Sequence, residues 1–184
     1  MQIKTTTQGA AAEGRDCALC ADLRWVPAGL LDLPEINRIA NQVHTTLPER
    51  DEVFGEKLRL FPEGCLKLMR ANEFLGYGIS HLWTLGIIPP LDTFLGSLPD
   101  RPNCIYVHDV VIHPSGRGRN AAGEYIRRIS EVALRHGIRS IALVSVYGTD
   151  VLWRRFGFSV VEDSNLRAKI ASYGESAKYM VSKL

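Results

Sequence analysis

The segment that most constrains the fold is residues 104–146, where two apolar runs flank a helical pattern. Residues 104–113, CIYVHDVVIH, are rich in β-branched side chains, which favour an extended strand. Residues 121–137 carry apolar side chains at helical spacing and end at Gly137, and residues 140–146, SIALVSV, are nearly all apolar. Such an apolar run is typical of a strand buried on both faces. The segment therefore predicts a right-handed strand–helix–strand unit whose strands lie close together in one sheet.

Strand and helix patterns alternate on either side of this unit. A helix is expected to begin near Pro34, and others are expected over residues 49–60 and 149–156. The remaining strands are predicted at 22–28, 65–69, 74–83, 158–161 and 178–184. This mixed order predicts an α/β or α+β domain in which helices pack on one sheet. We expect a single domain over residues 21–184, preceded by a flexible leader over residues 1–20.

Composition excludes several classes of function. Hydrophobic residues make up 46% of the chain and charged residues 23%, which is ordinary for a soluble globular protein. The formal net charge of +2 is too small to favour nucleic acid or a membrane surface as a partner. No apolar run approaches the roughly 18 residues that a membrane span needs, and the N-terminus lacks the apolar core of a secretory signal. We therefore expect a cytoplasmic protein without nucleic-acid or membrane partners.

The cysteines do not favour a metal site. Cys17 and Cys20 form a C-x-x-C, but the sequence has no second such pair and no histidine pair at ligand spacing. Cys65 and Cys104 lie in apolar strand-like runs and are expected in the core. The last three residues, Ser-Lys-Leu, match a peroxisomal import address, which predicts that compartment if the source is eukaryotic. The alternative is a terminal strand that happens to end in these residues.

The turn between the strand and the helix, PSGRGRNAAG (114–123), suits a phosphate. Helix N-termini expose backbone N–H groups and a partial positive charge, glycine lets the backbone approach a ligand, and arginine forks match phosphate oxygens. The alternative is an exposed basic turn. A P-loop would need a Lys followed by Ser or Thr, and a dinucleotide fingerprint would need an acidic residue soon after the next strand. Neither pattern is complete here.

The wider order resembles that of the GNAT family, the Gcn5-related N-acetyltransferases. The resemblance covers residues 22–184 and is carried by two stretches, residues 107–126 and YGTDVLWRRFGF (147–158). The pyrophosphate motif of the family, Q/R-x-x-G-x-G/A, falls on residues 117–122, with Asn120 in place of the middle glycine. Asparagine tolerates left-handed backbone better than most residues, so the loop is expected to keep its shape.

The resemblance implies a mixed, mostly antiparallel sheet of about seven strands flanked by about four helices. It also implies acetyl-CoA as cosubstrate and no metal. Backbone groups of Val110, Val111 and Ile112 would hold the pantetheine arm as a partial extra strand, and the amides of residues 118–123 would hold the pyrophosphate. The expected cofactor-binding residues are Val110, Val111, Ile112, Arg117, Gly118, Arg119, Asn120, Ala121, Ala122, Gly123 and Trp153.

Acetyl transfer to an amine needs a base for the ammonium and a proton donor for the leaving thiolate. The strand VHDVVIH (107–113) is similar to one in the arylalkylamine N-acetyltransferase branch, which implies that His108 acts as base through water. Asp109 is expected on the opposite face of the strand. The tyrosine acid of many GNAT enzymes is replaced by Trp153, so Tyr147 is the expected acid, and the alternatives are Ser145, Thr149 or protonation of the thiolate by solvent.

The loop over residues 84–103 is longer than most connections and suggests a binding loop. Its apolar residues and those of the preceding segments are candidates for an acceptor pocket, although each could equally be core: Phe54, Phe61, Trp83, Leu91 and Phe94. The resemblance implies direct attack on acetyl-CoA, in a ternary complex, by the primary amine of a small aryl- or alkylamine. The alternatives are a catalytically weak acetyl-CoA-binding module and a protein N-terminal or lysine acetyltransferase. We expect a monomer or a homodimer.

Overall fold

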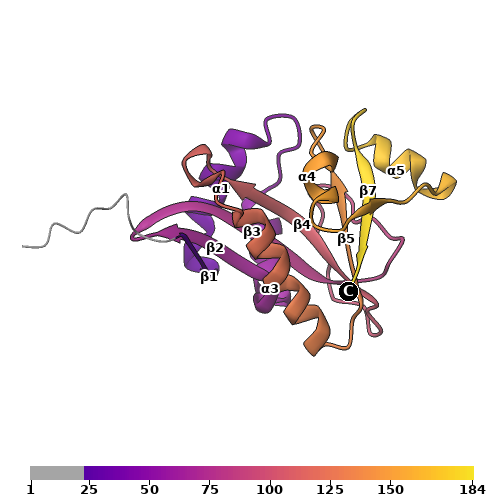
Figure 1. Ribbon diagram of the computed structural model, residues 1–184, viewed down its shortest axis with the longest axis horizontal. Helices are drawn as coiled ribbons and strands as arrows, with labels where there is room; N and C mark the ends of the chain where they lie inside the picture. The colour runs from indigo at the N-terminus through magenta and orange to yellow at the C-terminus, as the bar shows by residue number, and fades with distance from the viewer. Residues whose placement is uncertain (1–22) are drawn as a thin grey trace, which may run out of the picture.

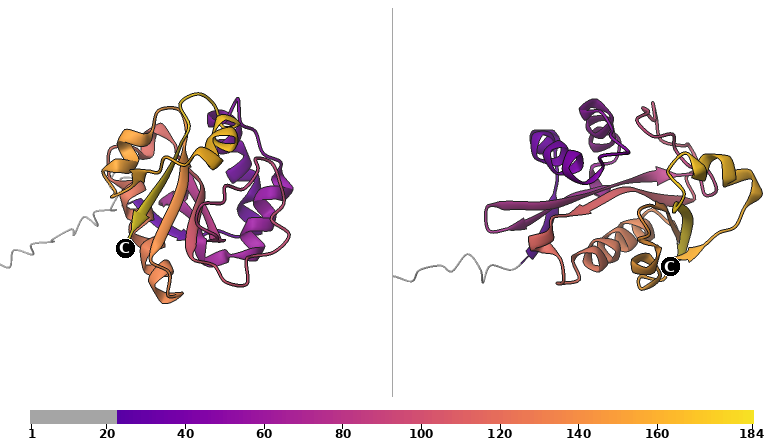
Figure 2. Two further views of the ribbon diagram at one scale, coloured as in Figure 1. Left: turned by 90° about the vertical axis from the view of Figure 1, so that its right-hand side faces the viewer. Right: turned by 90° about the horizontal axis from the view of Figure 1, so that it is seen from above.

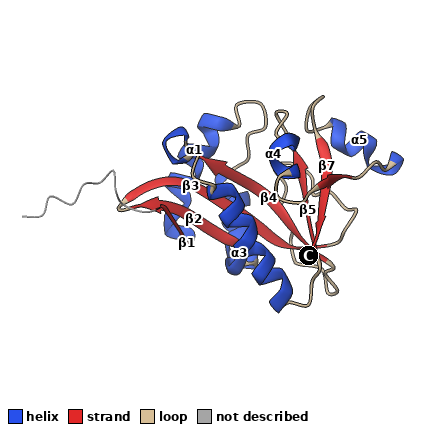
Figure 3. Cartoon of the chain, in the orientation of Figure 1, coloured by secondary structure: helices blue, strands red, loops and turns tan. Residues whose placement is uncertain are grey.

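The computed structural model describes residues 23–184, so the expected leader and the Cys17–Cys20 pair lie outside the described part of the chain. Seven strands form one sheet in the order β1-β2-β3-β4-β5-β7-β6 (Figures 1 and 3). The strands are β1 (Leu23–Pro27), β2 (Cys65–Arg70), β3 (Glu73–Trp83), β4 (Cys104–Ile112), β5 (Ser140–Ser145), β6 (Ser159–Val160) and β7 (Lys178–Lys183). The α-helices are α1 (Leu33–Val43), α2 (Asp51–Leu60), α3 (Ala121–Arg135), α4 (Asp150–Arg154) and α5 (Arg167–Ala171).

The sheet confirms the predicted mixed topology. β4 and β5 are adjacent and parallel, with Ile105 opposite Ile141 and Val107 opposite Leu143, and every other neighbouring pair is antiparallel. The predicted strands and the first four helices are present, with ends shifted by one or two residues. The fifth helix, α5, was not predicted, because five residues are too few to display a helical repeat.

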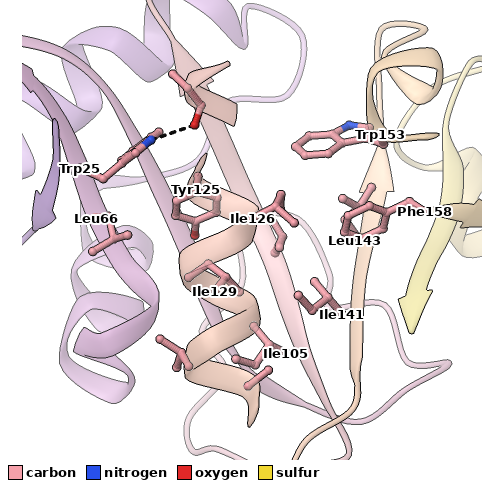
Figure 4. Packing of buried hydrophobic residues seen from close by; sticks show 14 of the residues in the cluster. Trp25, Leu66, Ile105, Tyr125, Ile126, Ile129, Ile141, Leu143, Trp153 and Phe158 are labelled. Atoms are coloured by element: carbon pink, nitrogen blue, oxygen red, sulfur yellow. Dashed lines mark hydrogen bonds between the residues drawn. The ribbon is translucent and has the colours of Figure 1, made fainter. Parts of the chain in front are cut away.

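Helices cover both faces of the sheet. Figure 2, right, shows α1 and α2 above the sheet and α3 below it. On the α3 face, Tyr125, Ile126 and Ile129 pack against strand residues such as Ile105 and Leu143, as Figure 4 shows. On the opposite face, a second cluster joins α1 and α2 to β3 and β4, and a third brings α5 against β4, β5 and β7. Cys65 and Cys104 are buried in these two clusters, as predicted.

Two buried polar contacts fix the start of α3 relative to the sheet. The Trp25 indole N–H donates to the Ala121 carbonyl at 2.8 Å, a bond drawn in Figure 4. One turn further on, the Tyr125 hydroxyl donates to the Gly64 carbonyl at 3.0 Å and lies 2.6 Å from Ser80 Oγ. A Cβ on Gly78 would overlap the Tyr125 ring, so only glycine lets α3 approach β3 this closely. The N-terminal part of α3 is therefore held firmly against β1, β3 and the turn before β2.

The two parallel strands separate after a short paired region. β4 and β5 pair only over residues 105–107 and 141–143, while β4 continues to Ile112. Figure 1 shows the two strands diverging toward their carboxyl ends. Residues 108–112 therefore lack β5 as a neighbour, and a wedge opens between the strands.

The C-terminal residues belong to the sheet. Ser182 and Lys183 pair with Ile141 and Ser140, and the Leu184 N–H donates to the Arg139 carbonyl at 3.1 Å. The last residues of the sequence therefore extend β7 along β5. In the described residues, no helix is long and apolar enough to cross a membrane.

Candidate active site

A cavity of about 720 Å³ occupies the wedge between β4 and β5. Its floor is β4 from Val107 to Ile112 together with Leu143 and Val144 of β5. One wall is formed by the loop after β4, the start of α3 and the end of α4. The other wall is formed by α1, the α1–α2 connection, Phe54, Leu91 and Tyr173. We call the first wall and the β4 edge at residues 110–112 the cofactor half, and we call the second wall, together with His108 and Asp109, which contact it, the acceptor half.

The cofactor half fits the expected acetyl-CoA. β4 is extended and unpaired by β5 beyond Val107, which leaves an edge on which a pantetheine arm can add. The first bond inside α3 is donated by the Glu124 N–H to the Asn120 carbonyl, at 3.0 Å, so the amides of residues 121–123 are not needed by the helix. A Cβ on Gly118 would meet no atom within 4 Å, so the backbone there faces open space. These features suit a pyrophosphate at the N-terminus of a 15-residue helix.

Asn120 adopts the backbone that the missing glycine would have supplied. Its φ is +55° and that of Gly118 is +78°, both in the left-handed region. The expected tolerance of asparagine is therefore confirmed at the level of the backbone. Arg117 uses its Nε to donate to the Ile112 carbonyl at 3.0 Å, which ties the loop to the end of β4.

The cavity is lined by most but not all of the expected cofactor residues. Arg119 and Gly123 are absent from the lining. The lining members are Val110, Val111, Ile112, Arg117, Gly118, Asn120, Ala121, Ala122 and Trp153. Gly123 also has a packing role, because a Cβ there would overlap the Asn120 side chain and would meet the Phe156 ring at 2.8 Å.

A β-bulge at His108 corrects the predicted orientation of Asp109. Val107 pairs with Ser80 and Asp109 pairs with Ile79, so His108 is an extra residue in β4 with no partner of its own. The extra residue shifts the alternation by one position, and both His108 and Asp109 contact the α1–α2 side of the sheet. The regular period of two assumed from the sequence fails at this point.

His108 forms a buried pair with a glutamate from the α1–α2 connection. His108 Nε2 lies 2.6 Å from Glu49 Oε2, and the two side chains are only 4% and 6% exposed. Burial alone would raise the pKa of Glu49. The charge of His108, its hydrogen bond and the charge of Lys57 outweigh burial and, with the Asp92 N–H, lower the pKa of Glu49 to about 2. Glu49 is thus an ionised carboxylate at neutral pH.

This partner defines the tautomer of His108. An ionised carboxylate only accepts hydrogen bonds, so Nε2 of His108 must carry the proton that points to Glu49. In the neutral ring, Nδ1 then carries the lone pair. His108 is a histidine oriented by a carboxylate, which is the arrangement that general bases use.

A second histidine–carboxylate pair lies beside the first. His44, the residue that ends α1, places Nε2 3.0 Å from Asp109 Oδ1, and the Tyr77 hydroxyl donates to Asp109 Oδ2 at 2.5 Å. Burial lowers the pKa of His44, but the hydrogen bond and charge of Asp109 outweigh it and raise that pKa above its usual value. His44 Nδ1 is buried without a hydrogen-bond partner, and the Tyr147 ring stacks on the imidazole at 5.9 Å. His44 is therefore less suited than His108 to take a proton from a ligand in the cavity.

Tyr147 spans the mouth of the cavity. Its hydroxyl lies 3.3 Å from Thr46 Oγ1, 101 residues away in the sequence, and its φ of +55° is unusual for a tyrosine. The alternative acid Thr149 is already engaged, because its hydroxyl donates to the Val146 carbonyl and accepts from the Trp153 indole. Ser145 Oγ also lies 3.1 Å from Thr149 Oγ1. Of the three hydroxyl candidates, Tyr147 remains the one that faces the cavity with a half-exposed side chain.

The expected pocket residues separate into two groups. Phe54 and Leu91 line the acceptor half. Phe61 lies in the α3-face core against His136, and Trp83 donates its indole N–H to the Ile87 carbonyl. Phe61 and Trp83 are therefore not among the lining residues, and Phe94 instead lies under the Arg50 guanidinium at 5.4 Å.

The split sheet thus opens beside a helix N-terminus, and a buried histidine–glutamate pair lies on the opposite side of the cavity. The sequence profile of the acetyltransferase (GNAT) family matches residues 33–158, which is more than half of the chain. The chain belongs to the GNAT family, and it is an acetyl-CoA-dependent N-acetyltransferase. A comparison with curated protein sequences finds no match.

Solved structures share the fold at low sequence identity. Ard1 from Thermoplasma volcanium superposes with a TM-score of 0.68 at 12% identity, covering 88% of this chain and 97% of that one. Diaminobutyrate acetyltransferase EctA from Paenibacillus lautus, solved with its substrate and coenzyme A, gives 0.65 at 12% identity and covers 88% and 94%. N-acetylglutamate synthase from Neisseria gonorrhoeae, solved with coenzyme A and N-acetyl-glutamate, gives 0.65 at 15% identity and covers 89% and 35%. These structures share the fold of this chain, and no comparison supports the arylalkylamine branch.

Proposed function

We propose that this enzyme transfers acetyl from acetyl-CoA to the primary amine of a small acceptor that carries no carboxylate. The observation that carries the proposal is the buried His108–Glu49 pair, which faces the cavity beside the strand expected to hold the cosubstrate. A buried ionised glutamate is costly to desolvate, so its pairing with a histidine beside the cavity favours catalysis over a coenzyme-binding module.

Acetyl-CoA supplies the acetyl group as an activated thioester. The β4 edge at residues 110–112, which β5 leaves unpaired and where the Ile112 carbonyl accepts from Arg117, orients the pantetheine arm, and the amides at the start of α3 hold the pyrophosphate. Arg117 adds a charged fork at the same end. With acetyl-CoA held in this way, its thioester would lie next to the bulge at His108.

His108 removes the proton of the incoming ammonium. Its Nδ1 lone pair receives that proton, directly or through one water, and Glu49 stabilises the imidazolium that forms. Both described cysteines, Cys65 and Cys104, are buried away from the cavity lining, so a covalent acetyl-cysteine has no candidate residue there. The amine therefore receives acetyl directly in a ternary complex. Tyr147 is the proposed proton donor to the departing thiolate, because its hydroxyl reaches across the cavity mouth.

The charge of the acceptor half supports an amine without a carboxylate. Glu49 and Asp109 supply two carboxylates to this wall, and each is matched by one histidine. Among the described lining residues the arginines are Arg117 and Arg155, which belong to the loop after β4 and to the end of α4. A carboxylate on the acceptor would therefore be desolvated beside two like charges without a cation of its own.

The closure of the cavity supports a small acceptor over a protein N-terminus or lysine. Tyr147 and Thr46 join the two walls across the mouth, and the Tyr173 hydroxyl donates to the Pro89 carbonyl at 2.6 Å beside Leu91. These contacts restrict the space in which an extended peptide would have to lie. Most of the remaining lining is apolar, including Val43, Leu47 and Phe54, which suits an alkyl or aromatic body.

Matched acceptors test this proposal. We expect phenethylamine and pentylamine to be acetylated with kcat/KM at least roughly 100-fold above phenylalanine and norleucine, which differ from them only by a carboxylate. A short peptide with a free N-terminus is the third acceptor, and release of coenzyme A thiol is the measurement. Preference for the amino acids or the peptide would overturn the acceptor assignment. A rise in melting temperature with acetyl-CoA, but no transfer to any acceptor in a broad amine panel, would support the weak-module alternative.

A further inference from the structure

The loop over residues 84–103 is fastened to α2 and to the residues before it at two separate points. At the first point, Asp92 contacts Glu49 and Arg50, and we call this set the Asp92 anchor. At the second point, Glu56 of α2 accepts from the N–H groups of Leu95 and Gly96 at 2.6 and 2.9 Å, and we call this set the Glu56 anchor. Only the Asp92 anchor includes a residue of the candidate base.

In the Asp92 anchor, both the carboxylate and the backbone carbonyl of Asp92 accept hydrogen bonds from Arg50. Arg50 Nε donates to both carboxylate oxygens of Asp92 at 3.0 and 2.9 Å, and its backbone N–H donates to Oδ1 at 2.8 Å. Arg50 also reaches the Asp92 carbonyl at 3.0 Å. Asp92 has a φ of +47°, a left-handed conformation that these contacts hold in place. The ion pair is partly exposed, so its main effect is geometric rather than energetic.

The backbone N–H of Asp92 connects the anchor to the proposed base through Glu49. It donates to Glu49 Oε1 at 2.8 Å, while Glu49 Oε2 lies 2.6 Å from His108 Nε2. A carboxylate bound at both oxygens cannot rotate without losing one of its bonds. We propose that Asp92 and Arg50 are positioning residues that hold Glu49, and through Glu49 the imidazole of His108, in the orientation needed for proton removal. This inference deepens the proposed function and rests on it.

The same contacts couple the base to the acceptor. Leu91, next to Asp92 in the chain, lines the acceptor half of the cavity. An acceptor that packs against Leu91 therefore also affects Asp92, the next residue, which holds Glu49. A poorly fitting acceptor that displaces this part of the loop would also release one oxygen of Glu49 and loosen His108.

Two variants break the Asp92 anchor, and one matched variant breaks the other anchor. Asp92→Gly removes the carboxylate and accepts the left-handed backbone, and Arg50→Ala removes the other partner. We expect each to lower kcat roughly 10-fold, with unchanged affinity for acetyl-CoA. The effects of the two changes should not add in the double variant, because each breaks the same contact. Arg50→Lys, which keeps one donor, should restore part of the rate.

Glu56→Ala is the control, because it frees Leu95 and Gly96 without touching Glu49. We expect it to raise the KM for the amine while kcat stays within about 2-fold of the wild-type value. Circular dichroism melting curves identify any variant that fails to fold. An equal fall in kcat for Glu56→Ala and Asp92→Gly would overturn the proposal, since general loosening of the loop would explain both.

The imidazole nitrogens of His108 provide a readout that does not depend on turnover. In protein labelled with ¹⁵N-histidine, the five histidines are assigned by substitution. We expect wild-type His108 to carry its proton on Nε2 and the Asp92→Gly and Arg50→Ala variants to populate the Nδ1–H tautomer. Glu56→Ala should match the wild type. Unchanged His108 signals in both anchor variants would overturn the positioning role, whereas absence of amine acetylation by the wild type would overturn only the proposed function.

Discussion

The two halves of the cavity are built from the chain in different ways. The cofactor half comes from one continuous stretch, the end of β4, the turn after it and the start of α3, and it presents mainly backbone groups. The acceptor half is assembled from side chains that are far apart in the sequence. His44 and Glu49 reach over from the α1 region to residues of β4 that lie 65 and 59 positions further on.

This difference predicts how each half responds to substitution. Backbone groups survive most side-chain changes, so the cofactor half is sensitive only where φ is unusual, as at Gly118 and Asn120. The acceptor half depends on the identity of single side chains, because each buried charge has one partner. Changes in the acceptor half should therefore alter turnover, and changes in the cofactor half should alter affinity for acetyl-CoA.

The largest effect is expected for removal of the proposed base. His108→Ala should lower kcat by roughly 10²–10³-fold, because general base catalysis contributes on this scale. Affinity for acetyl-CoA, measured by calorimetry, should stay within a factor of about 2. His136→Ala is the matched control, since His136 lies at the end of α3 and contacts Glu63 on the surface. An unchanged rate in His108→Ala would show that His108 is not the base. It would also contradict the prediction that changes in the acceptor half alter turnover.

A smaller effect is expected on stability in acid. The pKa of Glu49 is lowered to about 2 in the folded protein, below its ordinary value of 4.5. Its contribution to stability is therefore present above pH 4.5 and is lost as the pH falls toward 2. A pKa shift of this size corresponds to roughly 3 kcal/mol of unfolding free energy, because each pKa unit corresponds to about 1.4 kcal/mol. The difference in unfolding free energy between wild type and Glu49→Gln, measured with urea, should shrink between pH 5 and about pH 3. A difference that is constant with pH would mean that Glu49 is not held ionised by its surroundings.

The same contrast explains what could be predicted from the sequence. The strand–turn–helix–strand order, the lining role of Arg117 and Gly118 and the left-handed Asn120 follow from local patterns, because these features depend on neighbouring residues. Glu49 and His44 carry no local signal. A glutamate just before a helix is common on surfaces, and only the packing of the α1–α2 connection over β4 brings it to His108.

Three sequence-based expectations were wrong or incomplete for identifiable reasons. The face of Asp109 was misassigned because a β-bulge interrupts the alternation of β4, and the sequence gives no warning of an extra residue. Phe61 and Trp83 were grouped with the pocket because aromatic residues suit both cores and pockets, and only packing separates these roles. α5 was not predicted because its five residues are too few to display a helical period.

The smallest effect is expected in the cofactor half, at the position where the family motif has glycine. Asn120 already has a φ of +55°, so Asn120→Gly changes flexibility more than shape. We expect the Kd for coenzyme A, measured by calorimetry, to change by less than about 3-fold, because asparagine pays little for left-handed backbone. Asn120→Val should weaken binding roughly 10-fold, since a β-branched residue with positive φ is strained by about 1–2 kcal/mol. Both variants should keep the kcat of the wild type at saturating acetyl-CoA, because the base lies on the other wall. If Asn120→Gly instead bound coenzyme A more than about 10-fold tighter, the asparagine side chain would itself weaken coenzyme A binding. The cofactor half would then depend on side-chain identity, as the acceptor half does.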